Sequence, residues 1–187
     1  MDRNFIIIDN FLDDPDRIRN QSLSLNFDRI QESVPGLRSS SSLVGDHQTE
    51  VETKLKTIFG GEIVWDWTQD SFYFHSCFVG CGPTQGGSET WVHKDSPEKD
   101  QGEFAAVLYL TPNPNHDAGT AIYCQTSDGE TELRPDMEPR IDIGVGNVYN
   151  RLVIYRGKAL FHGSILPGFG NTLETSRLTQ TFWFDVK

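Results

Sequence analysis

The chain has 187 residues, which is enough for one domain with a sizeable core and short for two. Its apolar, aromatic and charged fractions are ordinary for a globular protein. The formal net charge of -11 repels phosphate backbones, which excludes binding through a broad basic surface. We therefore expect no nucleic-acid partner.

The N-terminus lacks the features of an export signal. Its apolar run from Phe5 to Ile8 is too short, and aspartates stand on both sides of it. No stretch of the sequence approaches the length of a membrane span. We therefore expect a cytoplasmic protein without a membrane partner, and the small size favours a microbial or viral origin.

In chain order, a short strand and two helices come first. The segment 4–12 predicts a strand, and Asp14 followed by Pro15 predicts the cap and first position of a helix. The serine-rich segment 37–45 predicts a flexible surface loop. A second helix is predicted over 47–61, where apolar residues recur on one face and two glycines end the pattern.

From residue 62 onward the sequence changes to short segments rich in β-branched and aromatic residues, which are separated by Gly, Pro, Asn and Asp. This texture predicts a series of short strands. The predicted strands lie within 62–70, 71–80, 90–95, 103–112, 119–125, 140–150, 151–157, 159–166 and 177–186.

Short helices followed by many short strands predict a mainly β fold, a jelly-roll (cupin-like) double sheet with the N-terminal helices packed on one sheet. We expect one domain over 1–187, in which 1–61 supply a strand and helical support and 62–187 form the jelly-roll core. An immunoglobulin-like sandwich competes. The two leading helices and the lack of a cysteine-tryptophan-cysteine pattern count against it.

The three cysteines, Cys77, Cys81 and Cys124, are odd in number and form no CxxC pair. In a chain without an export signal, reduced and mostly buried thiols are the favoured interpretation. A disulfide between Cys77 and Cys81, or their part in a zinc site, is the less favoured alternative.

A candidate metal site begins with His93 and Asp95 in the segment TWVHKD. Two residues is the side-chain period of a strand, so both groups point to the same face. His162, at the end of an apolar run and before a glycine, is the favoured third ligand. Two histidines and one carboxylate would form one face of an octahedron and leave three positions open, which suits Fe(II) oxygenases. A surface ion pair between His93 and Asp95 is the alternative.

The other three histidines are weaker candidates. His47 lies in the polar segment at the start of the predicted second helix, and His116 lies in a predicted solvated turn. His75 lies among aromatic residues, where a hydrogen-bonded core histidine is the favoured interpretation.

The last predicted strand presents an unusual face. In period-two alternation Arg177, Thr179, Thr181 and Trp183 share one side, while the other side is largely apolar. A buried guanidinium is costly unless it meets an anion, and arginine binds a carboxylate through two hydrogen bonds. An exposed edge strand with a solvated Arg177 is the alternative.

From about residue 70 to its end, the chain resembles the Fe(II)/2-oxoglutarate-dependent dioxygenases, specifically their prolyl-hydroxylase-like branch. The blocks that carry the resemblance are HKD, AAVLYLTP, DAGTAIY, NRLVIYRGKALFHGS and SRLTQTFWFD, in this order. Their order and spacing are specific as a set, although each block alone is not. The opening NFIIIDNFLDDPDRIR is similar to the usual start of such domains, so the resemblance covers nearly the whole chain.

The resemblance implies a double-stranded β-helix fold with His93, Asp95 and His162 as ligands of Fe(II). It also implies 2-oxoglutarate and O₂ as cosubstrates and no catalytic residue beyond the metal ligands. The residues implied at the cosubstrate are Arg177 and Tyr109 on the distal carboxylate, Thr181 or Thr179 assisting them, and Trp183 in the pocket wall.

The activity implied is hydroxylation of a C–H bond, coupled to decarboxylation of 2-oxoglutarate to succinate. A prolyl residue in a peptide or protein fits the branch best, and a free amino acid or another small metabolite is the close alternative. A non-catalytic, metal-binding cupin-like protein is the alternative of another class, and Zn(II) would suit the same three ligands. The sequence does not define the oligomeric state.

The chain departs from the resemblance in two places. Fifteen positions separate His162 from Arg177, so we expect an extra loop near the cosubstrate. The family also often has a tyrosine shortly before the HxD motif, and none stands here. The glycine-rich segments 79–90 and 163–176 are predicted to close over the substrate. Because Asp95 is present, a halogenating variant is disfavoured.

Overall fold

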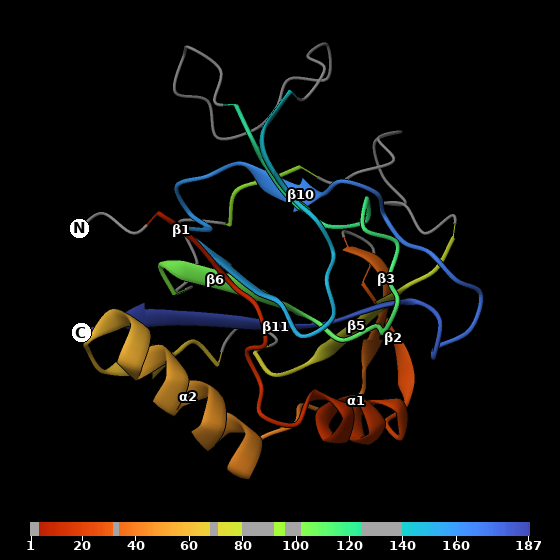
Figure 1. Ribbon diagram of the computed structural model, residues 1–187, viewed down its shortest axis with the longest axis horizontal. Helices are drawn as coiled ribbons and strands as arrows, with labels where there is room; N and C mark the ends of the chain where they lie inside the picture. Colours follow the sequence, from red (N-terminus) through yellow and green to blue (C-terminus); the bar gives the residue numbers. More distant parts are fainter. Residues whose placement is uncertain (1–3, 32–33, 68–70, 80–91, 96–101, 125–139) are drawn as a thin grey trace.

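The fold comes from a computed structural model, which describes residues 4–31, 34–67, 71–79, 92–95, 102–124 and 140–187 (Figure 1). Two helices and eleven strands lie within these residues. In chain order they are β1 Phe5–Ile8, α1 Pro15–Leu23, β2 Phe27–Gln31, β3 Val34–Ser39, α2 Asp46–Phe59, β4 Ile63–Trp65, β5 Phe74–Cys77, β6 Phe104–Tyr109, β7 Thr120–Tyr123, β8 Ile141–Val145, β9 Leu152–Tyr155, β10 His162–Ser164 and β11 Arg177–Val186.

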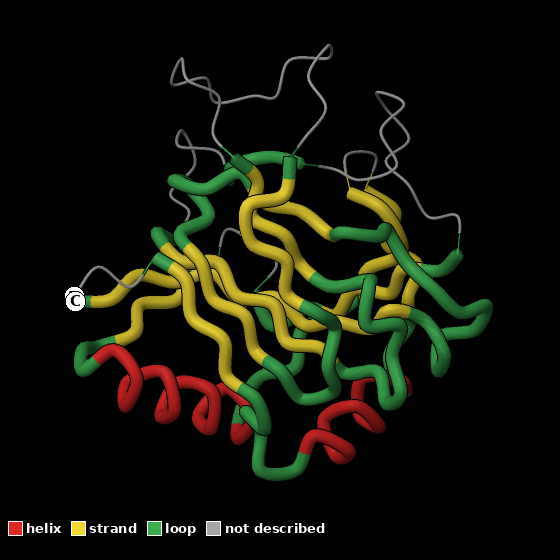
Figure 2. The backbone as a smooth tube through the Cα atoms, turned by 45° about the horizontal axis from the view of Figure 1, so that its top comes forward, coloured by secondary structure: helices red, strands yellow, loops and turns green. Residues whose placement is uncertain are grey.

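The described strands form two antiparallel sheets. The main sheet has eight strands in the order β1-β9-β6-β11-β5-β3-β2, with β4 paired to β11, and the small sheet has three in the order β10-β7-β8. The small sheet covers one face of the main sheet, and both helices pack on the opposite face (Figures 1 and 2). The prediction of a mainly β double sheet with helices on one side is confirmed.

Both predicted helices are present with the expected end signals. The Asp14 side chain accepts a hydrogen bond from the backbone N–H of Arg17, and Pro15 opens α1. The second helix ends at Phe59 and is capped by Gly60, whose N–H donates to the Lys56 carbonyl. The left-handed backbone of Gly60 (φ of 74°) then turns the chain away from the helix axis.

The central strand β11 lies between the apolar core under the helices and the space between the two sheets. Leu178, Phe182 and Phe184 point toward the helices and are fully buried in the largest apolar cluster. The alternating residues, beginning with Arg177 and Thr179, point toward the small sheet. This is the alternation predicted from the sequence.

Two local predictions were wrong. The predicted loop 37–45 begins as strand β3, because Leu37 and Arg38 pair with β5 and the buried Ser39 hydroxyl accepts the backbone N–H of Phe74. Serine is typical of loops, but here the pairing overrides the local preference. The predicted strand at 90–95 shows, in its described part, only an isolated bridge between His93 and His162.

Residues 1–61 supply three strands, not the single predicted strand, since β1, β2 and β3 all join the main sheet. Cys77 is buried and Cys124 is half-buried; neither is in a disulfide, as expected, and Cys81 lies outside the described residues. In the described part of the chain, neither helix has the length and apolar character needed to cross a bilayer.

A buried polar network joins α2 to β11 on the helix side of the main sheet. The Nε2 of His47 donates to the Gln180 side-chain oxygen over 2.7 Å, and the amide nitrogen of Gln180 donates to the Phe72 carbonyl over 3.2 Å. His47 is 2% exposed. Burial lowers the pKa of His47, and its hydrogen bond to Gln180 offsets this only in part.

Acidification from pH 7 to pH 5 should destabilise the protein, and less steeply in the His47→Gln variant. The lowered pKa of folded His47 means that the unfolded chain binds a proton near pH 6.5 while the folded chain does not. This contribution is present above pH 6.5 and is lost as the pH falls toward the folded pKa. It amounts to at most about 1.4 kcal/mol per pH unit.

Urea unfolding at pH 7, 6 and 5 with a chelator present measures this slope. His116→Gln, which changes an exposed histidine, should keep the wild-type slope. Equal slopes in His47→Gln and the wild type would contradict the assignment.

Candidate metal centre

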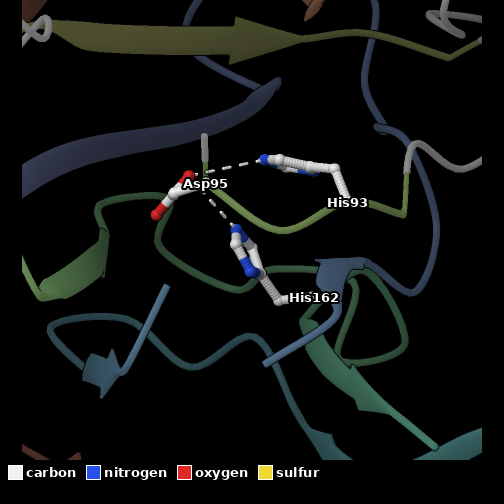
Figure 3. A group of neighbouring side chains, drawn as sticks. All are labelled: His93, Asp95 and His162. Atoms are coloured by element: carbon white, nitrogen blue, oxygen red, sulfur yellow. Dashed lines mark ion pairs between the residues drawn. The ribbon is translucent and has the colours of Figure 1, made fainter. Parts of the chain in front are cut away.

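Backbone pairing brings His93 and His162 side by side. Each N–H donates to the carbonyl of the other residue, over 3.0 and 2.8 Å, so the two residues form a bridge between otherwise separate segments. The backbone N–H of Asp95 donates to the carbonyl of Gly157 over 3.0 Å, which places the carboxylate opposite both rings. The three side chains converge from two chain segments (Figure 3).

The geometry of the three side chains is that of a metal-binding cluster. The Nε2 atoms of His93 and His162 each lie 3.7 Å from Oδ1 of Asp95, and all three ligand atoms lie within 4.8 Å of one another. Adjacent ligands of an octahedral ion with bonds near 2.1 Å lie about 3 Å apart. Small side-chain shifts therefore suffice to close the cluster around one ion.

The surroundings of His162 fix the tautomer and the protonation state that a metal ligand needs. Its Nδ1 donates to the Leu160 carbonyl over 2.9 Å, which leaves the Nε2 lone pair facing Asp95. Burial lowers the pKa of His162 to about 4, so the ring is neutral at pH 7. A neutral imidazole is the form that binds a metal.

Asp95 is a buried carboxylate, and one of its oxygens lacks a hydrogen-bond partner. Burial raises its pKa, and the charge of His93 together with the Trp183 indole acts in the opposite direction. Its Oδ2 atom is buried and has no partner that satisfies hydrogen-bond geometry. A buried carboxylate oxygen without a partner is costly, and a divalent cation is a group that would satisfy it.

The cluster opens into a cavity of about 130 Å³ between the two sheets. Arg177, Thr179, Thr181 and Trp183 of β11 all line this cavity, as the alternation predicted. The lining also includes residues that sequence reasoning did not select for the site, namely Arg38, His75, Cys77, Val107, Thr120, Tyr155, Gly163 and Ser164.

Arg177 is held at the wall opposite the small sheet. It is 7% exposed, and its Nε donates to the Ala118 carbonyl over 2.8 Å. Its guanidinium carbon lies 5.6 Å from the centre of the Tyr109 ring. These contacts fix the side chain while it still lines the cavity.

Tyr109 supports this wall from behind. It is fully buried, and its hydroxyl shares a hydrogen bond of 2.6 Å with Thr120, which lines the cavity. Burial raises the pKa of Tyr109, so the phenol stays protonated. The structure thus brings Tyr109 next to Arg177, although Tyr109 is not among the described residues that line the cavity.

The remaining three histidines do not belong to the metal-binding cluster. His47 belongs to the buried network behind β11, and His116 is exposed. His75 is buried as predicted, but it lines the cavity rather than the apolar core, and its Nε2 lies 3.3 Å from the Thr181 hydroxyl. Neither the aromatic neighbours of His75 nor the serines beside Arg38 gave a sequence signal for the cavity.

Of the two predicted lid segments, 163–176 is described and is tied to the end of β5. Phe169 donates its backbone N–H to the Cys77 carbonyl over 3.3 Å, and Val79 donates to the Gly170 carbonyl over 3.1 Å. Almost all of 79–90 lies outside the described residues.

The comparisons with known proteins give a family and a fold. A family model described as Family of unknown function (DUF6445) matches residues 2–144. A search of curated proteins gives no significant sequence match. Several solved structures align with nearly the whole chain at low sequence identity.

One similar structure is a prolyl hydroxylase from Trichoplax adhaerens in complex with a hypoxia inducible factor peptide fragment. Its TM-score is 0.56 at 13% identity, over 98% of this chain and 84% of that one. A prolyl-4-hydroxylase from Pseudomonas putida has a TM-score of 0.51 at 16% identity, over 98% and 93% of the two chains.

A third is HygX from Streptomyces hygroscopicus with nickel, 2-oxoglutarate and hygromycin B bound. Its TM-score is 0.55 at 12% identity, over 97% of this chain and 82% of that one. The chain therefore has the fold of these proteins, and the predicted double-stranded β-helix is confirmed.

Gly157→Ala should lower metal affinity about 10- to 100-fold. A Cβ atom at Gly157 would lie 1.8 Å from Oδ2 of Asp95 and would displace the carboxylate. Anaerobic calorimetry with Fe(II) measures the change. Gly144→Ala is the matched control, because its new methyl group would meet Ile165 at an ordinary 3.6 Å. Wild-type affinity in Gly157→Ala would contradict the placement of Asp95.

Proposed function

We propose that this chain, which belongs to the Family of unknown function (DUF6445), is an Fe(II)- and 2-oxoglutarate-dependent oxygenase that hydroxylates a C–H bond. The observation that carries the proposal is one cavity whose wall carries both a metal-binding cluster and a buried guanidinium. Its wall includes His93, Asp95 and His162 and also the buried Arg177. A site for a metal ion alone needs no such guanidinium.

The residues present fit a ferrous ion. Two imidazoles and one carboxylate are the donor set of the non-haem Fe(II) oxygenases, and three ligand positions would stay open for cosubstrates. Asp95 contributes a buried oxygen without a hydrogen-bond partner, and Gly157 leaves the space that this carboxylate occupies. His93, Asp95 and His162 would hold the ion.

The protein holds and orients 2-oxoglutarate. Arg177 would bind the distal carboxylate, because its Nε is fixed by Ala118 and its side chain lines the cavity. The hydroxyls of Thr179 and Thr181 would complete this end of the pocket. Tyr109, which lies behind the lining residues, would support Arg177 there.

Bound Fe(II) supplies the activation of O₂ that couples decarboxylation of 2-oxoglutarate, to succinate and CO₂, to insertion of an oxygen atom into a C–H bond. The chain would exclude water from the site and hold 2-oxoglutarate in a fixed orientation. Phe161, which precedes His162 and packs with Ala121 and Tyr123, is fully buried, and Trp183 lines the cavity beside Asp95.

The similar structures support a range of substrates rather than one. Two of them are prolyl hydroxylases, one in complex with a peptide, and a third holds the small molecule hygromycin B. For this chain we propose either a prolyl residue in a peptide or a small molecule such as a free amino acid.

His93→Ala and Asp95→Ala should each lower 2-oxoglutarate consumption at least about 100-fold, because each removes one of three ligands to the ion. Succinate release in air with added Fe(II) and ascorbate measures this, with or without a known substrate, since uncoupled turnover also releases succinate. His116→Ala, an exposed histidine, is the matched control and should keep the wild-type rate. Full turnover in either ligand variant would overturn the triad assignment.

A further inference from the structure

The phenols of Tyr109 and Tyr155 both lie between the two sheets, and they differ in their hydrogen bonding. Tyr109 is 0% exposed, and its hydroxyl shares a hydrogen bond of 2.6 Å with Thr120. Tyr155 is 5% exposed and lines the cavity. Within the described part of the chain, no group forms a hydrogen bond with the Tyr155 hydroxyl. A buried hydroxyl without a partner is costly, so its place in a cavity wall indicates a ligand that supplies the partner.

The register of the main sheet turns Tyr155 toward the metal end of the cavity. Tyr155 of β9 pairs with Ala105 of β6, and Ala105 pairs with Trp183 of β11. Directly opposed residues of antiparallel strands point to the same face, and Tyr155 and Trp183 both line the cavity. Asp95 lies beside this row, since a Cβ atom at Gly157 would be 1.8 Å from Oδ2 of Asp95 and 3.2 Å from the Ala105 methyl group.

Tyr155 also contacts one of the metal-binding side chains. The centre of its ring lies 4.5 Å from the centre of the His162 ring, at an interplanar angle of 45°. The Nε2 atom of His162 lies 3.7 Å from Oδ1 of Asp95. The phenol is therefore next to the His162 corner of the cluster, and both rings line the cavity.

The positions that stay open on a bound ion identify a partner for this phenol. When three ligands form one face of an octahedron, each open position lies opposite one ligand and next to the other two. Two of the three open positions are therefore next to His162. The adjacent keto and carboxylate oxygens of 2-oxoglutarate would chelate the ion and fill two positions, so at least one of these oxygens lies next to His162. The carboxylate is the stronger acceptor, because hydrogen bonds to a charged oxygen are stronger.

We propose that the Tyr155 hydroxyl donates a hydrogen bond to the metal-side carboxylate of 2-oxoglutarate, so that the cosubstrate is held at both ends. The inference rests on the proposed function, because it takes 2-oxoglutarate as the ligand of the cavity and Arg177 as the partner of its distal carboxylate. A phenol has one proton to donate, and a carboxylate oxygen accepts it. Tyr155 acts in binding and orientation only.

The test compares 2-oxoglutarate with pyruvate, which has the same keto and carboxylate groups but no distal carboxylate. Each acid is titrated anaerobically into the Fe(II)-loaded full chain, and the visible charge-transfer band of the chelate reports binding. Tyr155→Phe removes the hydroxyl alone and should weaken the binding of both acids about tenfold or more. The band should also move to shorter wavelength, because the lost hydrogen bond no longer stabilises the orbital of the chelate that accepts the charge.

Three controls accompany these titrations. The Fe(II) affinity of Tyr155→Phe, measured by calorimetry, should stay within about twofold, because the hydroxyl forms no hydrogen bond with the three ligand residues. Tyr149→Phe removes a hydroxyl that donates to Asp16 of α1, away from the cavity, and should bind both acids as the wild type does. Arg177→Ala should weaken 2-oxoglutarate binding but leave pyruvate binding within about twofold, because pyruvate has no distal carboxylate.

The outcomes separate the two proposals. If 2-oxoglutarate gives no charge-transfer band in the wild type, the proposed function fails and the assignment of Tyr155 falls with it. If the wild type binds and Tyr155→Phe binds equally tightly, or with an unshifted band, the proposed function stands and the assignment is wrong. The assignment is also wrong if Tyr155→Phe weakens 2-oxoglutarate alone, because the hydroxyl then meets the distal carboxylate. An equal loss of Fe(II) affinity would likewise overturn it, because the phenol would then support the metal site itself.

Discussion

The strand β11 is the constraint on which the rest of the structure depends. It is paired on both sides, with β6 and with β5, so its two faces have fixed and opposite surroundings. One face puts Leu178, Phe182 and Phe184 into the core under the helices. The other face aims a guanidinium and two hydroxyls between the sheets. A one-residue slip in its register would exchange the two faces and destroy core and site together.

The metal cluster depends on a different kind of contact, one between backbone atoms. His93 and His162 are joined by two reciprocal hydrogen bonds, and Asp95 is joined to Gly157. The absence of a side chain at Gly157 makes room for the carboxylate, which is then buried without a hydrogen-bond partner for one oxygen. A divalent cation would stabilise this buried carboxylate, and burial keeps His162 neutral.

Much of this arrangement was predictable from local sequence. The cap at Asp14, the glycine end of α2 and the alternation of β11 each depend on residues close in the chain, and the double sheet followed from the succession of short strands. The cavity role of Arg38 was not predictable, because it arises from pairing between β3 and β5, and the serines that follow it are typical of loops. His75 was assigned to the core, since its aromatic neighbours do not reveal which face of the strand meets the cavity.

The central claim is that one cavity binds a divalent ion and, dependent on it, 2-oxoglutarate held by Arg177. Anaerobic calorimetry tests it most directly, with Fe(II) titrated first and 2-oxoglutarate second, on the wild type and on Arg177→Ala. The account predicts that 2-oxoglutarate binds the wild type only after Fe(II), and that Arg177→Ala still binds Fe(II) but loses 2-oxoglutarate. Iron binding without any 2-oxoglutarate binding in the wild type would contradict the account and leave a metal-binding jelly roll.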